Sequence, residues 1–241
     1  PNGKTTSYTF DSAGNRLTET IATGAATVMT NYFYNEQNRL TSTITVQGNG
    51  QSEKLTYNYD DNGNLISRFK IRLNPAEPNL LGIFEVFKAG ESDNNDVSFY
   101  EYDPWNQLQK TTEGRKTITY AYNGEGYRVQ KTIDNQTSKY LYEYDKVVLE
   151  VDGTGAQIAK NIYGTNLISR TDSGETAYYL YNGHADVIAL IGTAGNTIAS
   201  YYYDAFGNTI EKTGESSNPY RYSGYRYDEE TDIYYLNARY Y

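Results

Sequence analysis

The chain has 241 residues, with 21 basic and 30 acidic side chains and a net charge of −9. This acidic balance argues against a nucleic-acid partner, since proteins that bind nucleic-acid backbones present basic surfaces, and no apolar run is long enough to cross a membrane. The absence of cysteine excludes disulfides, thiol catalysis and thiolate metal sites.

Tyrosine dominates the aromatic residues, with 28 Tyr against 7 Phe and 1 Trp. Tyr and Thr favour strands, and the frequent Gly, Asn and Asp favour turns. We therefore expect an all-β fold with many tight turns. Because the only methionine is Met29 and no signal-like start is present, we also expect the chain to be a fragment of a longer protein.

A short phrase recurs along the chain: two aromatic residues separated by one residue, then Asp or Asn, then a turn and an apolar residue. In chain order the phrases are centred on Asp11, Asn35, Asp60, Asp103, Asn123, Asp145, Asn182, Asp204 and Asp228. Successive phrases lie 20 to 25 residues apart, except for gaps of 43 and 37 residues, each near two periods. The second long gap holds a degenerate copy, IYGTNLISR, at 162–170.

Each phrase predicts a β-hairpin of about 20 residues. In YNYDDNGNLISR, the rings of Tyr57 and Tyr59 share one face of a strand, because side chains alternate along it. Asp60 ends the strand, and its carboxylate can accept from backbone amides two or three residues on. Gly63 tolerates the positive φ of a tight turn, and Leu65 begins the returning strand.

Hairpins that pair with their neighbours predict one antiparallel sheet. Strand twist has a fixed hand, so the sheet must curl into a barrel or a spiral wall. Cross-strand aromatic pairs contribute on the order of 0.2 to 1 kcal/mol each, so we expect a thin wall without a thick aliphatic core. We expect the tyrosine face to be the inner face.

An insertion at 71–98 interrupts the repeat. Pro75 and Pro78 are incompatible with a regular interior strand. The most apolar run of the chain, LLGIFEVF at 80–87, follows them. We expect a loop that packs its apolar face on the wall, with a plug or a partner-docking element as the alternative.

The phrases resemble the YD repeat of RHS-repeat proteins. The stretch YYLYNGHADVIALIGTAGNTIASYYYDAFGN (178–208) resembles the characteristic RHS core, and NPYRYSGYRYDEETDIYYLNARYY (218–241) resembles the RHS repeat-associated core motif. We therefore expect a YD-repeat hairpin array over 1–176 and the core region over 177–241.

The resemblance implies a role as well as a fold. Bacterial RHS proteins wind such hairpins into a spiral hollow β-shell that encloses a C-terminal polymorphic toxin, and they are secreted or lie at the cell surface, some associated with the cell wall. The implied partners are that toxin domain and other segments of the same shell, with self-association through strand edges, no nucleic acid and no membrane insertion. A teneurin-like extracellular adhesion or carbohydrate-binding module is the alternative.

The resemblance implies no enzyme in this chain. In bacterial members, aspartates linked to self-cleavage lie in a D-P-x-x-G-R-F…D-P segment after the ARYY sequence. The chain has no positions that match this segment before its last residue, Tyr241. We therefore expect no catalytic residue, no cofactor and no metal site.

Two residues differ from the family pattern: the family usually has Gly at the position of Asp232 and often has Gly at the position of Ala185. Asp232 stands where Gly suggests a positive φ, which Asp tolerates better than most residues at a cost of about 1 kcal/mol. Ala185 stands in NGHAD, and because alanine would be strained at positive φ, we expect an ordinary φ there.

Few side chains are candidates for chemistry. His184, the only histidine, could orient a turn by hydrogen bonding; a Ser-His-Asp triad using Asp186 is the less favoured alternative. The acidic cluster of residues 228, 229, 230 and 232 predicts a solvated turn, because its spacing does not match a calcium-binding EF-hand loop.

The remaining candidates are interpreted as structural. The adjacent pairs Asp60-Asp61 and Glu229-Glu230 do not indicate a glycosidase, because neighbours on a strand face opposite ways. Trp105, in a predicted type I turn over 103–106, is expected to pack on the wall rather than stack on a sugar. Asn135-Gln136-Thr137 matches a glycosylation pattern of no expected consequence.

Overall fold

The structure, a computed structural model, describes residues 3–73, 97–237, 239 and 240. Within them, every regular element is a β-strand apart from one short 3-10 helix, η3 (Tyr222–Gly224), and this confirms the predicted all-β class. In this described part, no helix has the length and apolar character needed to span a bilayer. The chain divides into two compact units, residues 1–117 and 118–241. The predicted boundary between a YD-repeat hairpin array (1–176) and the core region (177–241) stays a prediction.

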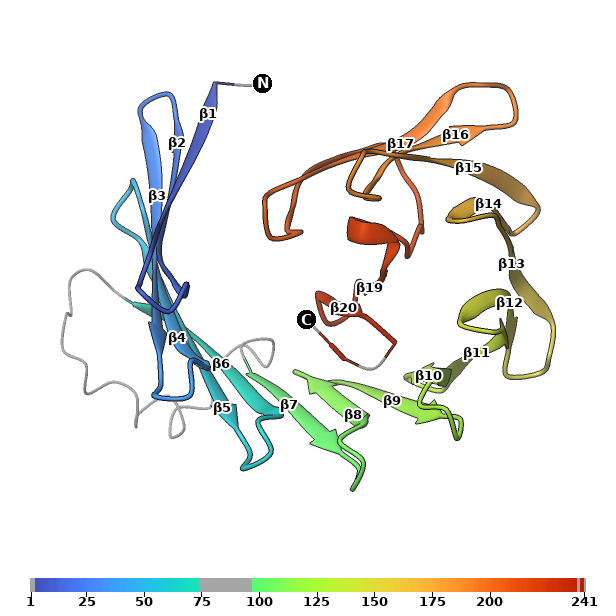
Figure 1. Cartoon of the computed structure of the whole chain (residues 1–241), viewed down its shortest axis with the longest axis horizontal. Helices are drawn as coiled ribbons and strands as arrows, with labels where there is room; N and C mark the ends of the chain where they lie inside the picture. Colours follow the sequence, from blue (N-terminus) through green and yellow to red (C-terminus); the bar gives the residue numbers. More distant parts are fainter. Residues whose placement is uncertain (1–2, 74–96, 238, 241) are drawn as a thin grey trace. The chain divides into compact units, whose positions relative to one another are not determined.

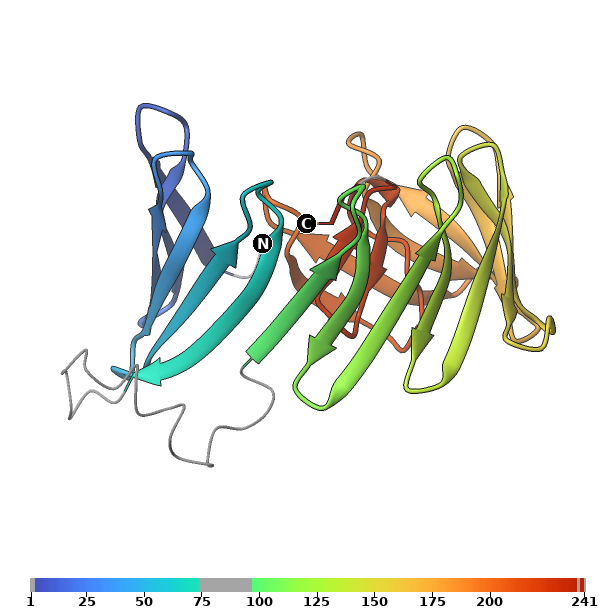
Figure 2. The ribbon, with the colours of Figure 1, turned by 90° about the horizontal axis from the view of Figure 1, so that it is seen from below.

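Unit 1 consists of hairpins that follow one another in chain order. Its strands are β1 (Lys4–Phe10), β2 (Arg16–Thr23), β3 (Ala26–Tyr34), β4 (Leu40–Gln47), β5 (Ser52–Tyr59), β6 (Leu65–Leu73), β7 (Val97–Tyr102) and β8 (Leu108–Glu113). Each strand pairs antiparallel with the next, from β1 to β8 (Figure 2).

Unit 2 continues the pattern. Its strands are β9 (Lys116–Tyr122), which begins two residues before the unit, β10 (Arg128–Ile133), β11 (Gln136–Glu143), β12 (Lys146–Asp152), β13 (Gln157–Tyr163), β14 (Leu167–Asp172), β15 (Glu175–Tyr181), β16 (Val187–Gly192), β17 (Thr197–Tyr203) and β18 (Thr209–Thr213). They again pair in sequence. A small hairpin, β19 (Arg226–Asp228) with β20 (Ile233–Tyr235), follows.

The strands of unit 2 curve around its own C-terminal part (Figure 1). We call the described residues between 214 and 240 the C-terminal segment. The core of the unit is a mixed cluster of aliphatic and aromatic side chains that includes Leu167, Tyr179, Val187, Leu190 and Tyr201. The wall is therefore less purely aromatic than the sequence predicts, because aliphatic side chains fill the spaces between its tyrosine rings.

The predicted insertion is shorter than its expected bounds of 71–98. β6 continues through Leu73 and β7 begins at Val97, because both strands find antiparallel partners there. The apolar run at 80–87 lies outside the described residues.

The Asp or Asn of the phrase closes a five-residue loop at the end of each hairpin. Its side chain accepts a hydrogen bond from the backbone N–H four residues further along the chain, as Asp11 does from Asn15 at 2.8 Å. It usually accepts a second hydrogen bond from the N–H two residues further along. Residues 35, 60, 103, 123, 152, 182 and 204 make the same bond to the fourth residue. The acceptor thus spans the whole loop, one residue further than the sequence predicts. Asp145 and Asp228 depart from this pattern: Asp152 forms such a loop in place of Asp145, and the carboxylate of Asp228 binds side chains of β10.

The fourth residue of each loop has a positive φ, which explains the glycine that recurs there. Gly14, Gly63 and Gly207 take this place, and so does Ala185 with φ 66°. The ordinary φ expected for Ala185 is therefore wrong: the left-handed conformation brings Asp186 back to Asn182, so that the Asn182 N–H donates to the Asp186 carbonyl at 3.1 Å and the Asp186 N–H donates to the Asn182 side chain at 3.0 Å. Asp232 has φ 56°, as expected for a residue in a glycine position.

In five hairpins of the described chain, a tyrosine of the phrase bonds the hairpin to the one before it; it is the second aromatic of the phrase except at Tyr142, which is the first aromatic of the Asp145 phrase. The hydroxyl of Tyr59, for example, donates to the carbonyl of Leu40, the first residue of the preceding returning strand, at 2.9 Å. Residues 34, 142, 181 and 203 donate in the same way to the first residues of β2, β10, β14 and β16. A register shift, as in a β-bulge, accompanies this tyrosine, between Asn58 and Tyr59 for instance. Bulges bend a strand and increase its twist, so the phrase both ties the hairpins together and curves the wall.

Candidate functional site

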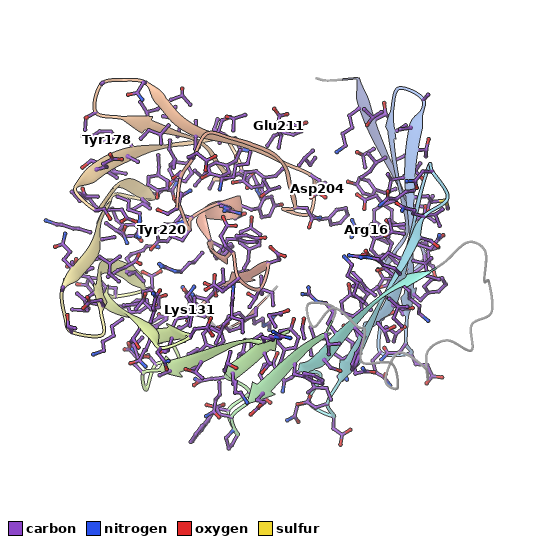
Figure 3. All side chains as sticks on the ribbon, turned by 180° about the vertical axis from the view of Figure 1, so that it is seen from behind. Arg16, Lys131, Tyr178, Asp204, Glu211 and Tyr220 are labelled. Carbon is purple, nitrogen blue, oxygen red and sulfur yellow. The ribbon has the colours of Figure 1, made fainter. Side chains whose placement is uncertain are left out.

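The feature of the molecule most relevant to function is the tyrosine-bearing face of unit 2, which its C-terminal segment covers. Ring contacts join the two. Tyr220 meets Tyr179 at a centroid distance of 6.3 Å, and Tyr222 meets Tyr203 at 5.7 Å, both edge to face. Tyr220 lies on the side that the strands enclose, whereas Tyr178 points away from it (Figure 3). The tyrosine face of unit 2 is thus concave and is packed against an extended piece of the same chain.

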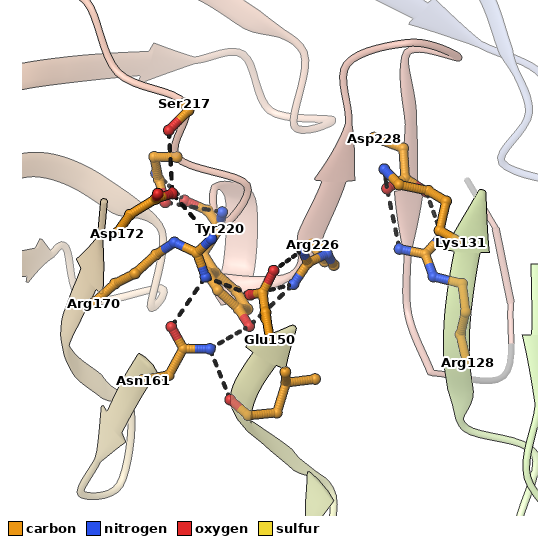
Figure 4. A network of polar contacts seen from close by, with 12 residues as sticks. Arg128, Lys131, Glu150, Asn161, Arg170, Asp172, Ser217, Tyr220, Arg226 and Asp228 are labelled. Atoms are coloured by element: carbon orange, nitrogen blue, oxygen red, sulfur yellow. Dashed lines mark hydrogen bonds and ion pairs between the residues drawn. The ribbon is translucent and has the colours of Figure 1, made fainter. Parts of the chain in front are cut away.

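The first ion-pair cluster of this interface contains Arg128, Lys131, Asp228 and Glu230, and we call it the Arg128 cluster (Figure 4). Arg128 on β10 binds both carboxylate oxygens of Asp228 on β19, and their side chains are 0% and 1% exposed. Lys131 binds Asp228 at 2.9 Å and also pairs with Glu230. A bidentate pair of this kind holds its partners in one orientation.

Aromatic rings surround the Arg128 guanidinium. It lies 4.4 Å from the ring centroid of Tyr235, and the rings of Tyr120, Tyr140 and Tyr240 lie within 5.8 Å. Burial alone would raise the pKa of the Asp228 carboxyl, but Arg128 and Lys131 outweigh it and hold that pKa well below its ordinary value. Asp228 is therefore a carboxylate at every physiological pH.

A second cluster, the Glu150 cluster, contains Glu150, Arg170 and Arg226. Arg226 on β19 binds Glu150 on β12 at 2.7 Å, and Arg170 on β14 pairs with the same carboxylate (Figure 4). Burial favours the neutral acid, but the two guanidinium groups hold the pKa of Glu150 well below its usual range. The cluster thus ties the C-terminal hairpin to strands of the wall that are far from it in sequence.

Amides and hydroxyls complete the interface around the Glu150 cluster. Asn161 donates to the hydroxyl of Tyr220 at 3.2 Å, and the hydroxyl of Tyr179 donates to the side chain of Asn218 at 2.6 Å. The buried charges of Arg226 and Asp228 therefore have partners on the wall, as buried charges require, while buried Arg221 pairs with Glu229 inside the segment.

The acidic turn predicted at residues 228–232 is only partly correct. Asp228 and Glu230 are buried in the Arg128 cluster, because a basic pair on β10 lies opposite them, while Glu229 is largely exposed. Among the described residues, no group of three or more acidic or histidine side chains could hold a metal ion. One signal in the sequence pointed to the cluster: Arg128 stands where other phrases have Leu40, Leu65 or Leu108.

The Arg128 cluster binds by charge and does not provide covalent chemistry. Joining Lys131 to Asp228 as an amide would need a neutral amine and a protonated acid. The carboxylates of Asp228 and Glu230 raise the pKa of Lys131, despite its burial, and the pKa of Asp228 is lowered. Both shifts favour the ionised pair.

His184, Asp186 and Ser223 do come together, but not as a catalytic triad. The Nδ1 atom of His184 lies 2.9 Å from the carboxylate of Asp186 and 3.4 Å from the hydroxyl of Ser223. A triad needs the carboxylate and the hydroxyl on opposite ring nitrogens. Asp186 instead accepts from the backbone N–H of Ser223 at 2.9 Å. The group fixes the strained turn at Ser223, where φ is 50°.

The other sequence candidates contribute little. Trp105 is 79% exposed, so the prediction that it packs on the wall is wrong: its turn holds the ring beyond the strands. The turn itself is present, since the N–H of Asn106 donates to the carbonyl of Asp103 at 3.0 Å. The side chain of Asp60 closes its loop, bonded to Asn64.

A cavity of about 330 Å³ remains beside the C-terminal segment. It lies between the β11–β12 turn, the β13–β14 turn and the residues around Tyr225. Tyrosine rings form much of its lining. It is the part of this interface that a further molecule could enter.

Comparison of sequences identifies relatives along almost the whole chain. Over 99% of its length the chain is 34% identical to a "tRNA3(Ser)-specific nuclease WapA" of Bacillus spizizenii and to a "tRNA nuclease WapA" of Bacillus subtilis. It spans only 9% of each of these relatives. No family model matches the chain.

Comparison of structures supports the fold. The chain resembles a component of the crystal structure of TcdB2-TccC3-Cdc42, with a TM-score of 0.50 and 18% identity, over 99% of this chain and 15% of that one. The Photorhabdus luminescens Tc holotoxin pore gives the same TM-score at 17% identity. At these identities the likeness concerns the fold alone.

Proposed function

Because this chain belongs to the RHS/YD-repeat proteins, we propose that it is a non-catalytic wall segment of a shell that encloses a C-terminal toxin polypeptide. The observation that carries this proposal is the curved, tyrosine-faced wall of unit 2, closed over an extended piece of chain by buried ion pairs. Such a face suits containment, since it binds polypeptide through rings and fixed charges and presents no catalytic constellation among the described residues.

The relatives support the same role. Those with 34% identity are named as tRNA nucleases, and this chain spans 9% of their length. A segment that consists of hairpins leaves any toxic activity to another part of such a protein. We include three further points in the same proposal. The enclosed toxin is a nuclease, and the protein is bacterial and is secreted or lies at the cell surface. Its partners are the toxin domain and other segments of the shell.

Limited proteolysis tests the proposal on the protein expressed from its complete reading frame. Polypeptide encoded beyond Tyr241 should survive protease that digests the same polypeptide made alone. Asp228→Asn should shorten its survival, because the substitution leaves Arg128 buried without its full counter-charge. Asp134→Asn is the matched control, since Asp134 is exposed in the turn between β10 and β11, away from the two ion-pair clusters. Equal digestion with and without the wall would overturn the proposal.

A further inference from the structure

Most of the tyrosine rings that line the cavity beside the C-terminal segment have hydroxyl groups that are already engaged. The hydroxyls of Tyr142 and Tyr181 donate to backbone carbonyls of Arg128 and Leu167 at 3.0 and 2.8 Å. The hydroxyl of Tyr163 bonds that of Tyr220 at 3.3 Å. These tyrosines line the cavity, so what they offer a ligand is ring surface. The lining favours a flat or bulky apolar group.

Charge within the cavity is largely balanced. Arg226 is among its lining residues, but both nitrogens at the end of its side chain bind Glu150, at 3.0 and 2.7 Å. The charged groups nearer to solvent, Asp145 and Lys146, bind each other at 3.2 Å. A charged ligand would therefore meet no free counter-charge among these groups, while peptide groups could bond to Asn166 at the rim.

The C-terminal segment shows what this face binds. At two places on the same face, a tyrosine ring of the C-terminal segment lies against a wall tyrosine: Tyr220 on Tyr179, and Tyr240 on Tyr120 at 5.8 Å. The cavity is continuous with this interface, because Tyr220 lines it as well. Its volume of about 330 Å³ is at the small end of the range for ligand pockets, about 300 to 1,000 Å³, and it suits one large side chain with its peptide groups.

We propose that this cavity binds an aromatic side chain of an extended polypeptide held against the wall. The inference rests on the proposed function, in which the enclosed toxin supplies that polypeptide. It adds a specific anchoring point: the wall does not merely surround its cargo but binds aromatic residues of the unfolded chain one at a time.

Binding of capped amino acids to the whole 241-residue chain tests the inference. We expect N-acetyl-tryptophanamide to bind with a dissociation constant in the millimolar range, about −4 kcal/mol, and N-acetyl-alaninamide to bind at least about tenfold more weakly. Nuclear magnetic resonance titration measures both constants. Chitotriose serves as the glycan probe, and binding of it in preference to the tryptophan probe would replace the polypeptide with a carbohydrate and overturn the inference.

Variants locate the site. Thr165→Trp places a ring at an exposed position of the lining and should abolish binding of the tryptophan probe, whereas Thr193→Trp, at an exposed turn outside that lining, should not. Tyr225→Ala removes a half-exposed ring from the cavity and should weaken binding at least about fivefold, and Tyr202→Ala, at a comparable exposure elsewhere, should leave it unchanged. Unchanged binding in both Thr165→Trp and Tyr225→Ala would overturn the inference.

The two proposals can fail separately. If the polypeptide beyond Tyr241 is protected from protease but the chain shows no preference for the tryptophan probe, containment stands and the anchoring point does not. If the probe binds as described but the polypeptide is digested freely, the cavity is an aromatic site and the shell function is wrong.

Discussion

At the scale of single residues, Ala185 shows how strictly the hairpin loop dictates its backbone. It has φ 66° in a position that four other phrases fill with glycine. A side chain in the left-handed region costs about 1 to 2 kcal/mol. Replacing Ala185 with Gly should therefore stabilise the chain, by about 0.5 to 1 kcal/mol after the added freedom of the unfolded glycine is subtracted. Urea unfolding of the two proteins measures the difference.

Ala194 provides the matched control for Ala185. It lies in another hairpin turn of unit 2, and its φ is not positive. Ala194→Gly should therefore destabilise the chain slightly, because only the entropic cost of glycine remains. If both substitutions lower the stability equally, the strain attributed to Ala185 is absent.

At the scale of the hairpin, a tyrosine hydroxyl that donates to the start of the preceding returning strand joins neighbours, as at Tyr59, Tyr181 and Tyr203. Tyr181→Phe removes the hydroxyl that donates to the carbonyl of Leu167 at 2.8 Å. Since this leaves a partly buried acceptor without that donor, we expect a loss of about 1 kcal/mol in the free energy of unfolding, with the ring packing retained. Denaturant unfolding monitored by circular dichroism would measure it.

Tyr144→Phe is the control for this hydroxyl effect, since Tyr144 is 89% exposed. Its stability should match the parent chain to within about 0.5 kcal/mol. A similar loss in both variants would mean that the hydroxyl of Tyr181 does not join the hairpins.

The hairpins could be predicted from the sequence because their determinants are local. The strand residues Tyr57 and Tyr59, the loop acceptor Asp60 and the turn residue Gly63 lie within a few positions of one another. The structure confirms the strand and the positive φ, and the Asp60 acceptor reaches one residue further than predicted. The φ of Ala185 differs from the expected value because the geometry of loop closure overrides alanine's own backbone preference.

The ion-pair clusters could not be predicted in the same way. Asp228 lies 100 residues from Arg128, and Glu150 lies 76 residues from Arg226. No local pattern relates such partners, and an acidic turn such as residues 228–232 is usually solvated. The sequence offers one hint: Arg128 stands at a position where other phrases have leucine, and a buried charge there needs a partner from elsewhere in the chain.

At the scale of the whole molecule, the two clusters determine how the closed interface of unit 2 responds to acid. The pKa values of Glu150 and Asp228 are both lowered in the folded chain. A carboxyl group with a lowered folded pKa contributes stability that is complete above its unfolded value, about 4, and is lost as the pH falls towards the folded value. Mild acidity should therefore leave the C-terminal segment in place.

We accordingly expect these clusters to contribute no change in the free energy of unfolding between pH 8 and pH 5. Below about pH 4 stability should fall steeply, by on the order of 2 kcal/mol for each of the two carboxylates. Thermal unfolding across this range measures the profile. Asp228→Asn should lower stability at neutral pH and flatten the acid limb, because the amide has no proton to gain. A parent profile that already falls between pH 6 and pH 5, or an acid limb that Asp228→Asn does not alter, would show that closure of unit 2 depends on groups other than these buried carboxylates.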